Sequence, residues 1–240
     1  MKTSINGKVL SAFKKLGVVA LITATLAVFF TACKQTGKGD GSGSGDGGGN
    51  GGGTTESEAP FVEGGVSLIL EPDISVISIR AETSDGNPIV VEGCAETSLP
   101  NDKRERLHPK GNTVILKGKI IYLSCGSTWL NAINVQGLST LQELYCEYNK
   151  LTSLNIQGLT ALKRLDFSAN PLNDKALIKI FNALPNRTKD DKAWCRVYSE
   201  RSDKYKDFNN PPTLKAAFDG AKNRNWTLKK VDANGNDVDI

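Results

Sequence analysis

The stretch LSTLQELYCEYNKLTSLNIQG (residues 138–158) is followed at once by LTALKRLDFSANPL (159–172), and the two match when one is shifted by 21 residues. The matching pairs are Leu138/Leu159, Leu141/Leu162, Leu144/Leu165, Cys146/Phe167, Asn149/Asn170 and Leu151/Leu172. A weaker third copy precedes them, in which Leu123, Cys125 and Thr128 take the places of Leu144, Cys146 and Asn149. A fixed period in this range indicates stacked repeats.

Each copy has the residue pattern of one short strand followed by a bend. Leu144 and Cys146 alternate with Glu143, Tyr145 and Glu147, so one side of the strand is expected to be buried and the other exposed. One copy alone buries too little apolar surface to offset the entropy of ordering its backbone, so neighbouring copies must stack. We expect the amides of Asn149 and Asn170 to satisfy backbone groups where the chain leaves the strand.

The spacing L-x-x-L-x-C/F-x-x-N-x-L resembles that of leucine-rich repeats, and the unit containing LTSLNIQGLTAL is similar to the short internalin-like repeats of bacterial surface proteins. The resemblance implies an α+β fold: a short leucine-rich-repeat solenoid with parallel β-strands, a β-rich N-terminal cap and a mixed α/β C-terminal cap. It also implies a role in protein–protein recognition, such as adhesion to host or neighbouring-cell proteins.

The N-terminus has the pattern of an export signal. Four lysines precede the apolar run LGVVALITATLAVFF, and small residues lead to Cys33. The sequence FTAC resembles a bacterial lipobox, with Phe30 where leucine is usual; this predicts a signal peptide over 1–32 and a lipid on Cys33. Cleavage after Ala32 with Cys33 left free, or an uncleaved apolar anchor, are the alternatives.

The lipoprotein interpretation is favoured by the Gly/Ser-rich segment over 33–59, a flexible tether with a reach of roughly 25–30 Å. Of the 30 Lys+Arg in the chain, four lie in the signal, so the remainder balances the 26 Asp+Glu. A neutral head argues against a nucleic-acid partner. The expected localisation is exported and membrane-anchored through Cys33, at the outer membrane or cell surface.

Residues 60–240 form the expected folded head. Their hydrophobic and turn patterns divide them into a β-rich cap over 60–117, repeats over 118–172 and a capping region over 173–240. Two charged or polar stretches, 99–112 and 186–210, are expected to be loops. A helix is expected after an N-cap at Asn173 or Asp174, because apolar residues follow at helical spacing. A second short helix is expected at PPTLKAAFDGAK. A hairpin is expected around Asn234–Gly235. Cys125 and Cys146 are expected to be core thiols without a disulfide between them, while the pairing of Cys94 and Cys195 is left open.

The outward positions of the repeat strands are the candidate binding face, since they carry tyrosines and charges. The candidate residues are Tyr122, Glu143, Tyr145, Glu147, Tyr148, Arg164 and Asp166, with Ser124 and Ser168 also expected to point outward. The alternative is that these tyrosines are present only because tyrosine favours β-strands and covers the sheet.

The expected function is non-enzymatic recognition of a protein ligand, with no cofactor and no metal. A periplasm-facing envelope protein is the alternative, and an enzyme is the third possibility. That third possibility requires Cys195, His108 and an acid to meet, which no sequence spacing indicates. DANGNDVD (232–239) has the oxygen density of a calcium loop but lacks its glycine and its final glutamate, so a polar turn is preferred.

Overall fold

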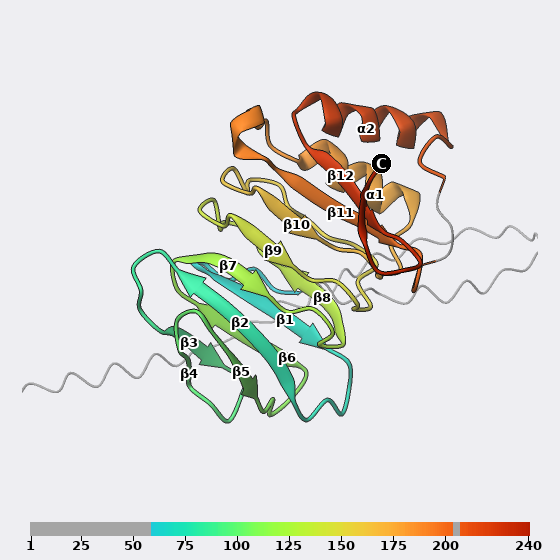
Figure 1. Cartoon of the computed structure of the whole chain (residues 1–240). Helices are drawn as coiled ribbons and strands as arrows, with labels where there is room; N and C mark the ends of the chain where they lie inside the picture. The colour runs from blue at the N-terminus through green and yellow to red at the C-terminus, as the bar shows by residue number, and fades with distance from the viewer. Residues whose placement is uncertain (1–58, 204–206) are drawn as a thin grey trace, which may run out of the picture. The chain divides into compact units, whose positions relative to one another are not determined.

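The computed structural model describes residues 59–203 and 207–240, which belong to one structural unit that begins at Gly53 (Figure 1). The predicted signal peptide (1–32), the lipid-bearing Cys33 and the tether up to residue 58 lie outside the described residues. In the described ranges, no helix is both long enough and apolar enough to cross a membrane.

A five-stranded sheet is built mainly from the residues that precede the repeats. Its order is β4-β3-β6-β1-β8, and every neighbouring pair is antiparallel. The strands are β1 (Gly65–Leu70), β3 (Ile89–Glu92), β4 (Ser98–Leu99), β6 (Thr113–Lys117) and β8 (Leu130–Asn134).

An eight-stranded mixed sheet contains the strands of the repeats. Its order is β13-β12-β11-β10-β9-β7-β2-β5; the pairs from β7 to β12 are parallel, and the pairs at both flanks are antiparallel. The strands are β2 (Ile77–Thr83), β5 (Lys103–Leu107), β7 (Ile120–Ser124), β9 (Glu143–Tyr145), β10 (Arg164–Asp166), β11 (Trp194–Ser199), β12 (Thr227–Val231) and β13 (Asp237–Asp239).

The predicted register of the repeats is confirmed. Leu123, Leu144 and Leu165 are paired across β7, β9 and β10, and all three are fully buried. The column continues through Cys195 on β11 to Leu228 on β12, which are also fully buried. The parallel strands run side by side through the middle of Figure 1.

The predicted α+β leucine-rich-repeat solenoid, with β-rich and mixed caps, is nevertheless wrong as a description of the fold. The protein is mostly β-structure in two sheets, one antiparallel and one mixed, with only two α-helices among the described residues. The reason is that residues 60–117 contribute strands to both sheets, and β8, from inside the first copy, pairs antiparallel with β1. The repeat strands are therefore the centre of a larger mixed sheet.

The predicted role of the two asparagines is confirmed. Asn149 accepts hydrogen bonds from the backbone N–H groups of Thr128 (3.1 Å) and Leu130 (3.0 Å), and its amide donates to the carbonyl oxygens of Cys125 (3.0 Å) and Cys146 (3.1 Å). Each copy is thus tied to the preceding one through backbone groups that the bend leaves unpaired.

Asn170 repeats this arrangement one copy later. It accepts from Leu151 N–H (3.0 Å) and donates to the carbonyl oxygens of Cys146 (2.9 Å) and Phe167 (3.0 Å). In the first copy Thr128 replaces asparagine, and its hydroxyl donates to the Cys125 carbonyl at 2.5 Å.

The expected C-terminal elements are present. Helix α1 (Asp174–Ala183) begins after Asn173, whose side chain accepts a hydrogen bond from Ala176 N–H. Helix α2 (Pro212–Asn223) is the second predicted helix, and β12 and β13 form the predicted hairpin, with Gly235 at a positive φ of 93°.

Two stretches predicted to be loops contain strands. Residues 99–112 include β5, and residues 186–210 include the 3-10 turn η1 (Lys189–Asp191) and β11. Strand β5 was missed because residues 103–106 are all charged and show no alternation of apolar residues. An edge strand can expose nearly all of its side chains. In β11, WCRVYS alternates with a period of two, a signal that the polar surroundings obscured.

The four cysteines of the described chain are all free and buried, which confirms the absence of a bridge between Cys125 and Cys146 and leaves Cys94 and Cys195 unpaired. They belong to one continuous apolar core that extends from Val66 to Leu228. Burial raises the pKa of all four thiols, and that of Cys94 to about 11, so they pack as small apolar side chains.

Candidate functional site

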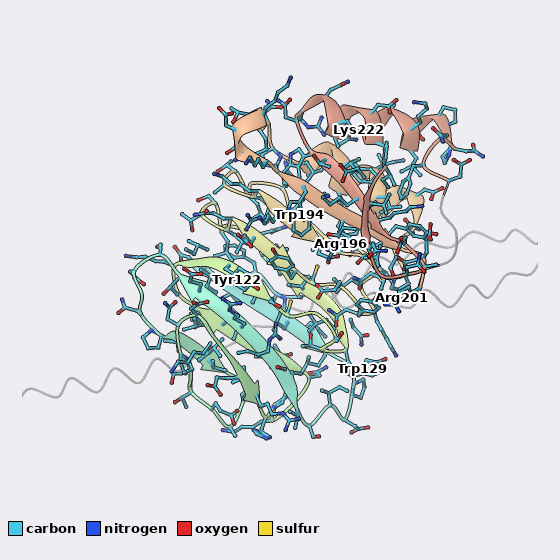
Figure 2. The ribbon with its side chains drawn as sticks, in the orientation of Figure 1. Tyr122, Trp129, Trp194, Arg196, Arg201 and Lys222 are labelled. Atoms are coloured by element: carbon cyan, nitrogen blue, oxygen red, sulfur yellow. The ribbon has the colours of Figure 1, made fainter. Side chains whose placement is uncertain are left out.

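Three aromatic rings line up on the outward side of the parallel strands. The ring of Tyr145 on β9 lies 5.4 Å from that of Tyr122 on β7 and 6.0 Å from that of Trp194 on β11. The rings are tilted or edge-to-face, the geometries that aromatic pairs prefer. Figure 2 shows Tyr122 and Trp194 along this run of strands.

Two arginines cover the ends of this row. The guanidinium of Arg80, on β2, lies 5.0 Å from the centre of the Tyr122 ring and pairs with Asp102 at 2.5 Å. The guanidinium of Arg196, on β11, lies 5.4 Å from the centre of the Trp194 ring. Both positions allow cation–π attraction.

Arg164, on the intervening strand β10, completes the set. It pairs with Glu143 at 2.5 Å, and the hydroxyl of Tyr145 donates to the other oxygen of the same carboxylate at 2.9 Å. Burial raises the pKa of Tyr145 well above its ordinary value, and the bond to Glu143 adds to this, so the phenol stays neutral. The surface made by Tyr122, Tyr145, Trp194, Arg80, Arg164 and Arg196 is called the aromatic face below.

Not every predicted outward residue is available on this surface. Asp166 is only 1% exposed, because Arg196 from the unpredicted strand β11 covers it with an ion pair of 2.5 Å. Ser124 and Ser168 are also buried. The prediction of an exposed carboxylate at position 166 is therefore wrong.

Glu147 lies against the backbone rather than in solvent. A side chain at Gly126 would begin 2.3 Å from Glu147 Oε1, so only glycine leaves room for the carboxyl. Among the described residues, its buried Oε2 has no hydrogen-bond partner. Burial raises the pKa of Glu147, and the neighbouring Asp166 carboxylate raises it further. A ligand cannot reach this oxygen unless the surrounding residues shift.

Tyr148 lies at the rim, just beyond the aromatic face. It is 45% exposed and has a positive φ of 54°, as do Ser127 (56°) and Ala169 (55°) at the equivalent places of the neighbouring copies. Trp129 is 53% exposed but lies beside the end of β1, where its main-chain oxygen accepts from Glu71 N–H at 2.9 Å, and Lys150 lies 5.4 Å from the centre of its ring. Tyr148 is thus the large aromatic presented to solvent at the edge of the face.

Of the predicted residues, the structure brings Tyr122, Glu143, Tyr145 and Arg164 together and leaves Tyr148 at the rim. The prediction missed Arg80, Trp194 and Arg196. Alternation in ISIRAET and WCRVYS could have found all three, since each strand shows an inward apolar residue at every second position.

His108 and Cys195 do not meet. His108 follows β5, five strands away from β11 in the sheet, which is about 24 Å at the usual strand spacing. Its Nδ1 lies 2.7 Å from Glu96, while Cys195 pairs in register with Leu165 and Leu228. The catalytic group that an enzyme was expected to require, Cys195 with His108 and an acid, is therefore not formed.

Three hollows of about 550–710 Å³ are lined by described residues, and none of them includes a residue of the aromatic face. The side chains of Tyr122, Tyr145 and Trp194 are half-buried. In the parts of the chain that are described, no cluster of three or more His, Cys, Asp or Glu side chains could hold a metal ion.

Comparisons of the chain with protein-family models, with curated proteins and with solved structures found no match. The resemblance to bacterial leucine-rich-repeat surface lipoproteins therefore stays a prediction.

Proposed function

We propose that this protein is an exported, lipid-anchored recognition protein that binds a protein partner through the aromatic face. The observation that supports the proposal is the composition of that face: one tryptophan, two tyrosines and three arginines on adjacent strands. Trp, Tyr and Arg are the residue types that dominate the binding energy of protein interfaces.

The face is also fixed in place before any partner arrives. Tyr145 is held by two rings and by Glu143, and Arg196 is held by Asp166 and by Asp237 at 2.6 Å. Side chains that are already ordered lose little conformational entropy on binding. Tyr148, which is exposed just beyond the end of β9, would add apolar contact area at the rim.

The anchoring part of the proposal comes from the sequence. A basic start, an apolar run and FTAC precede a Gly/Ser-rich segment that joins Cys33 to the head. A flexible tether directly after a lipidated cysteine holds a folded head away from a membrane. Metabolic labelling with a lipid analogue tests this part, with Cys33→Ala as the control; an unlabelled wild-type chain would contradict it.

Site-specific photo-crosslinking tests the recognition part. A photoreactive amino acid is placed at position 194 in the full chain in the producing cells, and in a matched chain at position 90. Val90 is a suitable control because it is 51% exposed and lies on β3, in the other sheet. We expect one defined protein adduct from position 194 and none from position 90. Equal crosslinking at both positions, or at neither, would contradict a binding role for the aromatic face.

A further inference from the structure

A hollow of about 570 Å³ lies between η1, the end of α2 and the start of β12, away from the aromatic face. Lys189 and Lys192 reach it from η1 and the residue that follows, and Lys222 reaches it from α2 (labelled in Figure 2). Ala193, Trp226 and Leu228 form its buried apolar floor. It is called the lysine pocket below.

Two of the three lysines of the lysine pocket have no ion-pair partner among the described residues. Lys189 and Lys192 form no ion pair within the described ranges, and Lys222 is bonded to the main-chain oxygen of Ile240 at 2.7 Å. Asp239 is the one carboxylate among the lining residues, and Lys229 already pairs with it at 2.6 Å. Asp191, on η1, pairs with Lys163 at 3.1 Å.

Lys189, Lys192 and Lys222 line the same hollow from two separate segments, so an anion bound there would meet positive charge from both of them. A phosphate monoester fits this arrangement better than a carboxylate, because it carries up to two negative charges and three acceptor oxygens. Lys222 donates to the main-chain oxygen of Ile240, so a bound phosphate would share or replace that contact. Asn225, also in the lining, uses its amide to donate to the Arg187 carbonyl oxygen at 2.7 Å, so the lysines are the donors left for a ligand.

We infer that the lysine pocket binds a phosphate monoester, with Lys189, Lys192 and Lys222 as its ligand-binding residues. The same chemistry occurs in a soluble phosphate ester and in the headgroup of phosphatidic acid. The site is independent of the aromatic face, so its failure would leave the proposed recognition function untouched.

The test uses the full chain, purified in detergent, and glycerol 3-phosphate as the soluble probe. Lys189→Ala/Lys192→Ala should weaken binding by about tenfold or more in calorimetric titration, since two charge-assisted contacts are lost. The matched control is Lys175→Ala/Lys179→Ala, which removes the same charge from exposed positions on α1. The control should bind within about twofold of the wild type.

A second variant acts in the opposite direction. Asp239→Asn removes the only carboxylate of the lining and should tighten binding of glycerol 3-phosphate several-fold. Calorimetric titration of the same chain with a short-chain phosphatidic acid then identifies the source. Binding that is tighter than that of glycerol 3-phosphate and is lost in the Lys189/Lys192 variant identifies the lipid headgroup; binding that is no tighter identifies the soluble ester.

Two results would overturn the inference. One is that glycerol 3-phosphate fails to bind the wild-type chain. The other is that the α1 control weakens binding as much as the pocket variant, which would show that net charge alone is responsible.

Discussion

The two sides of the parallel strands differ in how far they repeat. On the buried side, Leu123, Leu144 and Leu165 are the same residue on three neighbouring strands. On the outward side, the residues in register differ from strand to strand: Tyr122, Glu143 and Arg164 precede these leucines, and Trp194 precedes Cys195 on β11. Burial restricts the first set, whereas the second set is free to differ. Alternate residues of one strand therefore pack in the core or form the surface that we propose for recognition.

The largest effect is expected from breaking the buried side. Leu144→Ala removes a fully buried side chain from the centre of the column and should lower the free energy of unfolding by about 3 kcal/mol or more. Urea unfolding followed by circular dichroism measures this. A loss below about 1 kcal/mol would show that the column is not a packed core.

Substitution of the two asparagines tests the hydrogen bonds that join neighbouring copies. Asn149→Ala leaves the buried N–H groups of Thr128 and Leu130 unpaired and should cost about 2–3 kcal/mol. Asn170→Ala leaves one N–H unpaired, that of Leu151, and removes bonds to carbonyl oxygens like those lost with Asn149, so it should cost less, about 1–2 kcal/mol. The same urea measurement ranks the two; equal losses would contradict the role of the inter-copy hydrogen bonds.

Carboxyl groups beneath the outward side give a pH dependence. The folded-state pKa of Glu147 is raised by burial and by Asp166, so the unfolded chain loses this proton first as the pH rises. The stability is therefore highest below the ordinary pKa near 4.5 and falls as the pH rises through the folded pKa.

Glu147→Gln should make that fall shallower by at most about 1.4 kcal/mol per pH unit, the limit for one proton. Part of the slope should remain, because burial also raises the pKa of Asp166. Unfolding in urea at a series of pH values above 4.5 measures it. An unchanged slope in the variant would contradict the burial of this carboxyl.

The smallest effect on stability is expected from Glu96, near the edge of the sheet. Its contribution changes with pH in the opposite direction to that of Glu147. The backbone N–H of His108 and its ring lower the pKa of Glu96 to about 2, so the stabilising contribution is present above about 4.5 and is lost as the pH falls toward 2. Glu96→Gln should remove a small part of the acid-side loss, measured by the same unfolding series. A larger effect than that of Glu147→Gln would reverse the expected order.

The sequence predicted the parts of the molecule that follow a period. The 21-residue repeat predicts the register of Leu123, Leu144 and Leu165 and the bonds of Asn149, because burial leaves few alternatives at these positions. The two-sheet fold was not predictable in this way. The pairing of β8 with β1 joins segments about 60 residues apart through backbone hydrogen bonds, which leave no local pattern.

The candidate site shows the same limit. Tyr122, Glu143 and Tyr145 could be placed on one surface because they flank the repeated leucines. Arg80 and Arg196 reach that surface from strands outside the repeat, so only the assembled sheet brings them over the rings. The burial of Asp166 has the same origin, since its partner Arg196 is 30 residues away in the chain.

The separation of fold and recognition is tested most directly by Tyr122→Ala/Trp194→Ala, measured twice on the same full chain. Urea unfolding gives its stability, and photo-crosslinking from position 148, on the unaltered rim beyond β9, gives its partner binding. The expected result is a chain that loses less stability than Leu144→Ala does and no longer yields the adduct. A chain that keeps the adduct, or that unfolds as readily as Leu144→Ala, would contradict the assignment of binding to the outward side.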